Sequence, residues 1–409
     1  MAEKIIFHVD VNSAFLSWTA VDRLQKGETL DLRTIPSAIG GDVKSRRGVI
    51  TAKSIPAKAY GVTTGEPVVS ALKKCPELKL FPGDFVLYRK MSAAFMAICR
   101  ELTPEVEPFS IDECFMDMTG ILKHASRTEI VKAADSLRDR IREELSFTVN
   151  VGISENKLLA KTASDFKKPD RTHTLFKDEI PAKFWTLTVR ELLFAGKSSE
   201  ARLASLGIRT IGELAHTPLS VLQAHFGEKS GAYLHRASNG IDDSPVQTAQ
   251  EDAKSYGHST TLAEDILRAE EAYPVLLSLS DKAAERMRRD HVRADTVTVT
   301  IRTNGFQNYS RQRRMPLHTA ASDLIYEEAI RLFNALYDGK TPLRLLGVSL
   351  SGLIHDTDAE QMSFFGEEER EKKEKLGRML DDINMRFGKH SVVRGTFYEA
   401  EKKNSDTGL

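Results

Sequence analysis

At 409 residues, 41% of them apolar, the chain is long enough for two or more domains with ordinary hydrophobic cores. Lysine plus arginine and aspartate plus glutamate number 58 each, so net charge gives no sign of nucleic-acid binding, which would have to come from local patches. Three cysteines without metal-site or disulfide spacing, and the lack of a membrane-length apolar run, exclude a disulfide-stapled domain and a membrane protein; we expect a soluble, cytoplasmic protein.

The first predicted element is a buried strand that ends in a single acid. The apolar run over 4–11 carries Asp10 near its end, and a helix is predicted over 13–26. Asn12 and Ser13 are candidate caps for that helix. Asp10 is therefore expected at the carboxyl end of a strand.

The next part of the chain combines a basic insertion with two amphipathic helices. Residues 33–74 mix short strands, glycine turns and many basic residues. A helix capped by Asp84 carries apolar residues at spacings of 3 and 4 as far as Leu102. A second helix begins at a capping box formed by Ser126 and Glu129.

Two adjacent acids, Asp112 and Glu113, lie in an apolar segment that is predicted to form a hairpin over 105–118. Near a turn their side chains can face one site, and a divalent cation stabilises close carboxylates that otherwise repel. Together with Asp10 they can hold two Mg²⁺ ions, the arrangement that nucleotidyl transfer needs. Taken singly, each acid is better interpreted as a solvated loop carboxylate, and it is their pairing that favours a site.

These elements predict a ferredoxin-like split βαββαβ sheet. A strand over 147–153 completes the order strand, helix, strand, strand, helix, strand, and an extra helix follows over 156–166. Polymerase palms and nucleotide cyclases both use this sheet, so the fold alone leaves both functions open.

Residues 170–240 are predicted to be helical, with glycines at the helix junctions. Leu206-Gly207-Ile208 and Phe226-Gly227 look like helix-hairpin-helix turns, which aim backbone N–H groups and a helix N-terminus at a phosphate. Glycine at helix ends is also common for capping alone. Residues 241–254 are polar and acidic and are predicted to be a linker.

A second α/β unit is predicted from residue 255 onward. Residues 296–302 alternate between apolar and polar side chains, as in a strand with one buried face. Partner strands are expected at 309–315 and 344–352, with covering helices near 268–289 and 322–337.

Basic residues gather on the strands of this unit. Arg302, Arg311 and Arg313 are expected to share one exposed sheet face and to follow a phosphate backbone without reading bases. The alternative is a solvated surface with ordinary charges.

The tail from 354 is acidic and contains Gln361-Met362-Ser363-Phe364-Phe365, a glutamine and a small polar residue followed by two large apolar ones. An extended segment with exposed aromatic anchors is a familiar docking mode. A charged helix is predicted over 367–388 with an apolar stripe that includes Leu376, Leu380, Ile383 and Phe387, and the sequence assigns it no role.

Several motifs together resemble the Y-family DNA polymerases, the translesion enzymes of the DinB/UmuC type. They are Ser110-Ile111-Asp112-Glu113 with Asp10 and Phe15, the stretches 48–52 and 56–62, and the stretch 151–161. Their order and spacing are very specific, and the resemblance covers about residues 4 to 365. It identifies residues 361–365 as a bacterial sliding-clamp-binding peptide.

The resemblance implies an α+β multidomain fold. It has a ferredoxin-like palm with a small fingers insertion, a helical helix-hairpin-helix thumb, and an α/β little finger with a four-stranded sheet. The implied domains are palm 1–32 and 75–168, fingers 33–74, thumb 169–240, linker 241–254, little finger 255–353 and tail 354–409.

The resemblance also implies roles at the metal site. Asp10, Asp112 and Glu113 are the expected catalytic carboxylates, and they bind two Mg²⁺ ions, with Mn²⁺ as an alternative. The backbone carbonyl of Val11 is a further expected ligand. Phe15 is the expected steric gate against the 2′-hydroxyl of a ribonucleotide; without the resemblance it would be interpreted as a core helix residue.

The nucleotide triphosphate has its own expected partners. Backbone N–H groups of Ser13, Ala14 and Phe15 open a helix, which suits phosphate oxygens, and Lys58 and Lys157 match the triphosphate-binding positions of the family.

Three features depart from the family pattern. Lys58 stands where an arginine is commoner. A lysine binds phosphate as a point charge, whereas an arginine binds it with a fork of donors. Ile55 stands where a tyrosine often contacts the triphosphate. The first thumb hairpin, at 193–197, has one glycine fewer than usual.

These observations predict a low-fidelity, DNA-directed translesion DNA polymerase without a proofreading exonuclease. It is expected to use primer–template DNA and dNTPs, to dock on a sliding clamp through 361–365, to avoid membranes and to be a monomer. Two alternatives are a catalytically inactive DNA-binding scaffold and a cyclase-like nucleotidyl transferase on the same palm.

Overall fold

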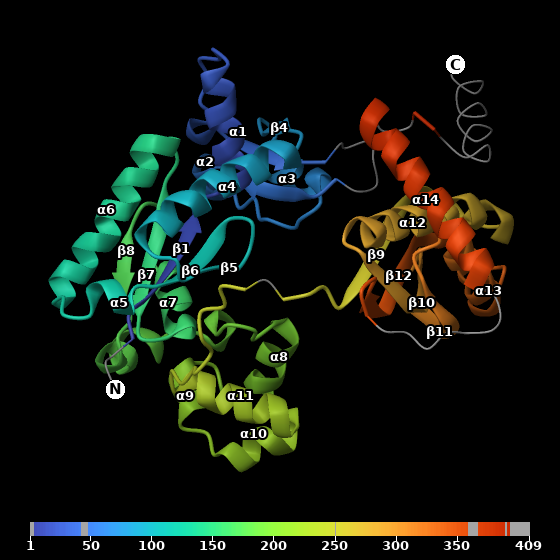
Figure 1. The fold of residues 1–409 in the computed structure, drawn as a ribbon. Helices are drawn as coiled ribbons and strands as arrows, with labels where there is room; N and C mark the ends of the chain where they lie inside the picture. Colours follow the sequence, from blue (N-terminus) through green and yellow to red (C-terminus); the bar gives the residue numbers. More distant parts are fainter. Residues whose placement is uncertain (1–3, 42–47, 250, 359–366, 389–390, 393–409) are drawn as a thin grey trace. The chain divides into compact units, whose positions relative to one another are not determined.

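Figure 1 shows the chain as a computed structural model that describes residues 4–41, 48–249, 251–358, 367–388 and 391–392. The chain divides into two compact units, which are treated separately below. Unit 1 comprises Met1–Lys44 and Gly48–Gln250, and unit 2 comprises Ser45–Arg47 and Glu251–Leu409. In the described part of the chain no helix is both long and apolar enough to cross a bilayer.

A five-stranded sheet with β1 at its centre organises unit 1. Its strands are β1 (Ile6–Val11), β5 (Val106–Pro108), β6 (Glu113–Asp117), β7 (Val149–Ser154) and β8 (Thr172–Thr174), in the order β5-β6-β1-β7-β8. The first four are antiparallel neighbours and confirm the predicted split βαββαβ arrangement. Strand β8 adds a parallel edge and lies inside the range predicted for the thumb.

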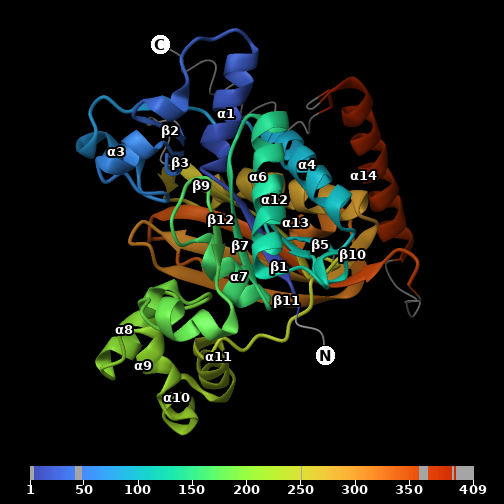
Figure 2. The same cartoon turned by 90° about the vertical axis from the view of Figure 1, so that its left-hand side faces the viewer.

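Helices cover both faces of this sheet. Helices α4 (Phe85–Leu102) and α6 (Arg127–Leu145) bury their apolar stripes in the main core on one face, onto which Figure 2 looks. The predicted caps of both helices are confirmed, since Asp84 accepts from two N–H groups and Ser126 forms a capping box with Glu129. The short helix α5 (Thr119–Leu122) precedes α6.

Helix α7 (Lys157–Ser164) covers the other face and lies very close to β7. Gly152 makes this approach possible, because a Cβ at that position would stand 2.0 Å from Ala160 O and 2.4 Å from Ser164 N. The backbone of α7 is thus fixed against the sheet next to the ends of β1 and β6.

Replacing Gly152 with alanine is expected to lower the free energy of unfolding by about 3 kcal/mol, because the new methyl group meets backbone atoms that have no rotamer freedom. Urea unfolding followed by circular dichroism measures the change. Gly120→Ala is the matched control, since nothing lies within 4 Å of its added Cβ. Equal stability of the two variants would contradict the close packing of α7 on β7.

The insertion after helix α1 (Ala14–Gln25) forms a small layer of its own. Its elements are η1 (Leu32–Thr34), β2 (Ser37–Gly40), β3 (Ile50–Lys53), α2 (Ile55–Ala59), α3 (Val68–Lys74) and β4 (Lys79–Phe81). The strands form a sheet of order β3-β2-β4, so this layer extends past residue 74. Leu16 and Ala20 of α1 pack onto Ile39 and Ala52 of the layer and join it to the palm-like sheet.

The segment 170–240, which was predicted to be helical, follows the sheet in unit 1. It contains η2 (Lys177–Glu179), η3 (Ile180–Phe184), η4 (Val189–Glu191), α8 (Lys197–Ser205), α9 (Ile211–Ala215), α10 (Leu219–Phe226) and α11 (Glu228–Ser238). Gly227, with φ of +81°, is the only residue between α10 and α11. Gly231 lets these helices touch, because a Cβ there would lie 2.6 Å from Gln223 N.

Unit 2 is built on the predicted four-stranded sheet. Its elements are β9 (Ser255–Ile266), α12 (Ala269–Arg289), β10 (Val292–Thr303), β11 (Asn308–Thr319), α13 (Ser322–Leu336) and β12 (Leu343–His355). The antiparallel order is β11-β10-β12-β9. Helices α12 and α13 bury the apolar residues of one face, and no described helix of this unit covers the other face, which is called the open face below.

The prediction that Arg302, Arg311 and Arg313 share one exposed face is wrong. Residues directly opposite each other in antiparallel strands point to the same side. Arg311 is paired with Val299 and Arg313 with Val297, whose side chains are buried under the helices.

The side-chain contacts agree with the register. Arg311 donates to Ala335 O of α13 at 3.4 Å, and Arg313 Nη1 lies 3.6 Å from a Glu328 oxygen of the same helix. Arg302 is paired with Asn308 and lies with Thr298 and Thr300 on the open face. Only Arg302 of the three therefore belongs to that face.

Helix α14 (Glu367–Phe387) packs on unit 2 through polar side chains. Arg288 of α12 makes two hydrogen bonds to Asp381, at 2.6 and 2.9 Å. Glu374, only 4% exposed, accepts from the Thr319 hydroxyl at 3.0 Å and from Ala320 N at 2.9 Å. Satisfied buried polar groups of this kind fix one docking geometry.

Most side chains of the apolar stripe predicted for this helix are exposed or half-buried. Leu376 and Phe387 are exposed, and Leu380 and Ile383 are half-buried. The residues 361–365 that precede α14 lie outside the described residues.

Candidate active site

The end of β1 and the start of β6 bring two of the predicted carboxylates together. Asp10 is directly opposite Glu113 in the antiparallel pair, so both side chains point to the face that α7 covers. Val11 N donates to Asp112 O at 3.0 Å and fixes the backbone at this junction. The sequence thus places three acids on two adjacent strand ends.

The predicted hairpin is present, with the acids at its turn. Phe109 N and Ser110 N both donate to Glu113 O, at 3.0 and 3.1 Å, which closes the turn around Asp112. The carboxylate of Asp112 accepts from the Ser110 hydroxyl at 2.6 Å. Asp112 therefore lies one residue from Glu113 but is held by its own turn.

Lys168 is the cation at Asp10. Its Nζ lies 2.9 Å from Asp10 Oδ1 and 2.8 Å from Asp165 Oδ1. Burial raises the pKa of Asp10 to about 6, and Lys168 opposes this rise. Burial lowers the pKa of Lys168, but the two carboxylates outweigh it and the net shift is upward.

Glu113 is held by Lys161 and by the buried His8. Lys161 Nζ makes a short ion pair with Glu113 Oε2. Burial raises the pKa of Glu113, but contacts from His8 and Lys161 outweigh it and bring the pKa down to about 2. Glu113 is therefore a stable anion.

His8 links this carboxylate to α7. Its Nδ1 is 2.8 Å from the Ser164 hydroxyl, and its Nε2 is 3.2 Å from Glu113 Oε2 without the alignment of a full hydrogen bond. Burial lowers the pKa of His8, so its imidazole is neutral at pH 7.

Lys157, which was predicted to bind the triphosphate, lies elsewhere. Its Nζ bonds both oxygens of Glu107, at 2.7 and 2.6 Å, and lies over the Phe115 ring. Lys157, Lys161, Ser164 and Lys168 follow one another at spacings of 4, 3 and 4 residues. The first three lie on one face of α7, so the spacing could have identified Lys161 from the sequence, whereas Lys168 lies beyond the end of this helix.

Lys58 is exposed on the short helix α2. It lies close enough to Lys53 to contribute, after burial, to the lowered pKa of that residue. Among the described residues no hydrogen bond or ion pair joins Lys58 to the three carboxylates. Ile55, at the start of the same helix, is 59% exposed and offers no polar group.

The start of α1 carries the remaining predicted residues. Ser13 has a φ of +49° and makes no side-chain cap, and the first N–H groups of a helix have no acceptor within the helix. Phe15 is half-buried, stacks on Tyr88 with ring centroids 4.5 Å apart, and lies 5.8 Å from the Phe85 ring. Both the core and the steric-gate interpretations of Phe15 agree with this position.

Carboxylate oxygens are the donors that Mg²⁺ prefers, so the chemistry of Asp10, Asp112 and Glu113 suits this ion. In the described residues no three acidic, His or Cys side chains converge closely enough to hold a metal. Ammonium groups of Lys168 and Lys161 lie against Asp10 and Glu113 instead. The donor type therefore fits magnesium, while these two ammonium groups neutralise Asp10 and Glu113 in this structure.

Comparison with known proteins identifies the family of the chain. Residues 9–165 match the impB/mucB/samB family, residues 253–364 match its C-terminal domain, and residues 195–242 match a thumb domain described for DNA polymerase-iota.

Curated relatives match over almost the whole chain. DNA polymerase IV of Clostridium acetobutylicum is 44% identical, over 98% of this chain and 100% of its own. DNA polymerase IV of Pelotomaculum thermopropionicum is 39% identical over 95% and 94%, and DNA polymerase IV 1 of Bacillus subtilis is 35% identical over 99% and 96%.

A solved Y-family DNA polymerase chimera has the same fold, with a TM-score of 0.76 at 22% identity over 86% of this chain and 99% of its own. The ferredoxin-like sheet, the helical thumb domain and the four-stranded C-terminal sheet agree with that architecture. The chain therefore belongs to the DinB-type Y family and is a DNA-directed DNA polymerase.

Proposed function

We propose that this polymerase performs low-fidelity translesion synthesis by two-metal nucleotidyl transfer at Asp10, Asp112 and Glu113. The observation that carries the proposal is the direct pairing of Asp10 with Glu113 at the strand ends, one residue from Asp112. When bound there, two Mg²⁺ ions would activate the primer 3′-hydroxyl and stabilise charge on the transferred phosphorus.

The chain's own residues prepare the site. Lys161 keeps Glu113 ionised, and His8 lies against the same carboxylate. The N–H groups of Ser13, Ala14 and Phe15 are available for triphosphate oxygens. We assign Lys168 as the main triphosphate cation, because it stands at Asp10, whereas Lys157 is bound to Glu107. Lys58 remains a second, exposed phosphate contact in this proposal.

The proposal of low fidelity rests on the small size of the fingers layer, which was described above as the insertion after α1. That layer has a three-stranded sheet and the short helices α2 and α3, which offer little surface to close around a base pair. The chain is also proposed to have no proofreading exonuclease, in keeping with a role on damaged templates.

Contacts along the DNA are proposed for unit 2. Arg302 on the open sheet face is the candidate phosphate contact, because Arg311 and Arg313 face α13. Clamp binding is proposed for Gln361, Met362, Ser363, Phe364 and Phe365. Their short motif and their place between β12 and α14 support it.

Primer extension tests these proposals. The wild-type protein is given an undamaged or an abasic template, each dNTP, Mg²⁺ or Mn²⁺, and a bacterial sliding clamp or none. Extension past the lesion, frequent misincorporation and clamp stimulation are the expected results. An error rate at replicative levels would refute the low-fidelity proposal, and DNA binding without extension would favour the inactive-scaffold alternative.

Replacing Phe15 with alanine is expected to raise ribonucleotide incorporation relative to deoxynucleotide incorporation by about a hundredfold, because the ring no longer occupies the space of a 2′-hydroxyl. The measurement is the ratio of kcat/KM for a dNTP and the matching rNTP. Phe85→Ala, at the exposed neighbouring ring, is the control and is expected to leave the ratio unchanged. An unchanged ratio in Phe15→Ala would make Phe15 a core residue only.

A further inference from the structure

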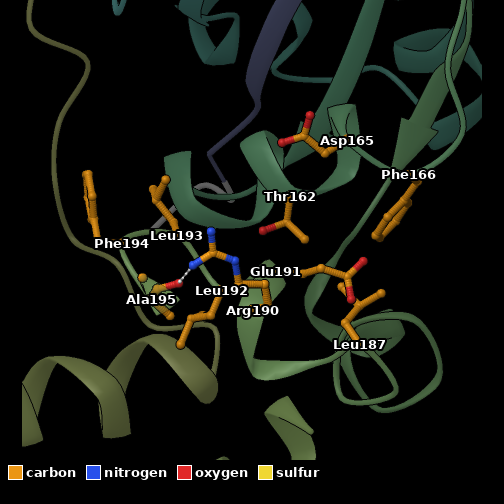
Figure 3. Close-up of a pocket in the computed structure, with 11 residues that line it drawn as sticks. Thr162, Asp165, Phe166, Leu187, Arg190, Glu191, Leu192, Leu193, Phe194 and Ala195 are labelled. Atoms are coloured by element: carbon orange, nitrogen blue, oxygen red, sulfur yellow. Dashed lines mark hydrogen bonds between the residues drawn. The ribbon is translucent and has the colours of Figure 1, made fainter. Parts of the chain in front are cut away.

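The segment 165–171 joins α7 to β8 and carries Lys168, and it is called the Lys168 loop below. Its first residues, Asp165 and Phe166, border a pocket of about 560 Å³ that lies between the end of α7 and residues 190–196 (Figure 3). Packing of side chains therefore leaves the start of the loop open on one side. The position of the loop depends instead on polar contacts with the palm-like sheet and with α6.

Asn150 of β7 is the buried anchor of this loop. It stands directly opposite Asp10 in the pairing of β1 with β7, so its side chain points to the face that α7 covers. Asn150 is fully buried, and its Nδ2 donates to Ser164 O at 3.1 Å and to Lys167 O at 3.0 Å. One amide group thus joins the last residue of α7 to the residue before Lys168.

Asn12, at the end of β1, completes the buried contact. Its Nδ2 donates to Asn150 Oδ1 at 3.1 Å, and its own Oδ1 accepts from Asp170 N at 2.9 Å. Arg171 N also donates to Asn150 Oδ1, at 3.3 Å. Both amide groups therefore have partners at their oxygen and at their nitrogen, and buried polar groups that are satisfied in this way hold one geometry.

Arg138 of α6 holds the same loop at Asp170. Its Nη2 donates to Asp170 O and to Asp170 Oδ1, both at 2.9 Å, and its Nε donates to Oδ1 at 3.1 Å. Asp170 has a φ of +56°, which aspartate adopts more readily than most other residues with a side chain. The Lys168 loop is thus fixed at two places, by Asn150 on the sheet and by Arg138 on α6.

The ammonium group of Lys168 is what this arrangement places at the site. It lies 2.9 Å from Asp10 Oδ1 and 2.8 Å from Asp165 Oδ1. A lysine side chain is long and flexible, so the place that its ammonium group reaches depends on where the backbone of the loop lies. A cation that is already in position stabilises the charge of a phosphate without reorganisation when the substrate arrives.

We propose that Asn150 and Arg138 are positioning residues for nucleotide binding. They fix the Lys168 loop so that the ammonium group of Lys168 stands at Asp10, where the triphosphate of the incoming nucleotide binds. The inference rests on the proposed function, in which Lys168 is the main triphosphate cation.

The test measures incorporation of a single nucleotide on an undamaged primer–template with Mg²⁺ at varied dNTP concentration. Asn150→Asp keeps the size of the side chain but turns an oxygen toward Ser164 O and Lys167 O, and Arg138→Gln removes the fork of donors at Asp170. Each is expected to raise KM for the dNTP about tenfold and to change kcat less than about twofold, because a displaced cation weakens binding of the nucleotide before the chemical step.

Two control variants remove comparable contacts away from the loop. Ser154→Ala deletes the buried hydrogen bond from Ser154 Oγ to Leu175 O on the same strand β7. Arg140→Gln deletes the ion pairs of an α6 arginine with Glu101 and Glu144. Both controls are expected to keep the wild-type KM.

A double-mutant cycle with Lys168→Ala shows whether the effect passes through Lys168. In the Lys168→Ala background, Asn150→Asp and Arg138→Gln are expected to change KM by less than about twofold. A full tenfold rise in that background would overturn the inference, because the two residues would then act on the nucleotide independently of Lys168. A thermal melt shows whether each variant folds, and where Asn150→Asp does not, Arg138→Gln at a half-buried residue decides the question alone.

The outcomes separate this inference from the proposed function. A wild-type KM in Lys168→Ala would contradict the role assigned to Lys168, and the inference with it. A raised KM in Lys168→Ala, together with a wild-type KM in Asn150→Asp and Arg138→Gln, would contradict the inference alone.

Discussion

Asparagine in place of Asp10 is expected to slow nucleotide incorporation at least about a thousandfold. The substitution keeps the shape of the side chain and removes the charge opposite Glu113, so Glu113 and Asp112 lose the third anionic donor for the metal ions. Lys168 also loses its ion pair at 2.9 Å and is no longer held beside the site. The measurement is single-turnover incorporation of one dNTP with enzyme in excess over primer–template.

Two controls make this result specific. Asp22→Asn is the matched change on the adjacent helix α1, and it is expected to leave the rate unchanged. Within the described residues, the Asp22 side chain makes an ion pair with Lys26 one turn away and no other. Binding of primer–template by Asp10→Asn should stay within about threefold of wild type, because cations at the phosphates supply most of the affinity for DNA and Asp10 is an anion. A loss of rate below tenfold would show that Asp10 is not a catalytic carboxylate.

The sequence predicted this part of the molecule well because two local rules combine there. The apolar run that ends at Asp10 and the short runs on both sides of Asp112 and Glu113 indicate strands, and the order of elements then indicates the ferredoxin-like sheet. Once β1 and β6 are neighbours, acids at their adjoining ends must lie close together. The structure adds the register that sets Asp10 opposite Glu113.

The prediction that Arg302, Arg311 and Arg313 share one sheet face was wrong because the pattern within a strand does not determine the register between strands. Arg311 and Arg313 do share a face, as alternation requires. Whether that face is also the face of Arg302 depends on the connection over 304–307, and a shift of one residue there reverses the answer. The sequence could not supply that register.

For helix α14, the sequence pattern did not predict which side is buried. An apolar stripe on a charged helix ordinarily marks the buried side, yet Arg370 and Glu374 are the buried residues here. The surface they meet offers backbone groups, since Arg370 donates to His318 O and Glu374 accepts from Ala320 N. Complementary polar groups of this kind cannot be recognised before the fold brings them together.

The lysines of the site were missed for a related reason. Lys157 belongs to a recognisable motif at the start of α7, but the lysine that contacts Asp10 lies beyond the end of this helix. The helix stops at Ser164, and the chain then turns back so that Lys168 reaches Asp10. The motif identified the helix correctly, and the turn beyond it determined which lysine is beside the carboxylates.

Substitution of Lys168 by alanine is expected to lower kcat/KM for dNTP incorporation about a hundredfold, as for the loss of one preorganised charge on a transferring phosphate. The reason is its position, since the ammonium group at Asp10 is the cation nearest to where magnesium and the triphosphate would bind. Steady-state incorporation at varied dNTP concentration measures the effect, and most of it should appear in KM if Lys168 binds the triphosphate before the chemical step.

Lys157→Ala is the comparison that decides between the two lysines. It is expected to destabilise the fold, because it leaves Glu107 half-buried without its cation, but to change kcat/KM of the folded enzyme by less than about threefold. A fall in kcat/KM as large as that of Lys168→Ala would instead support the role that the family resemblance gave to Lys157. It would mean that the Lys157–Glu107 ion pair opens when the nucleotide binds, so that the contact seen here belongs to the nucleotide-free enzyme.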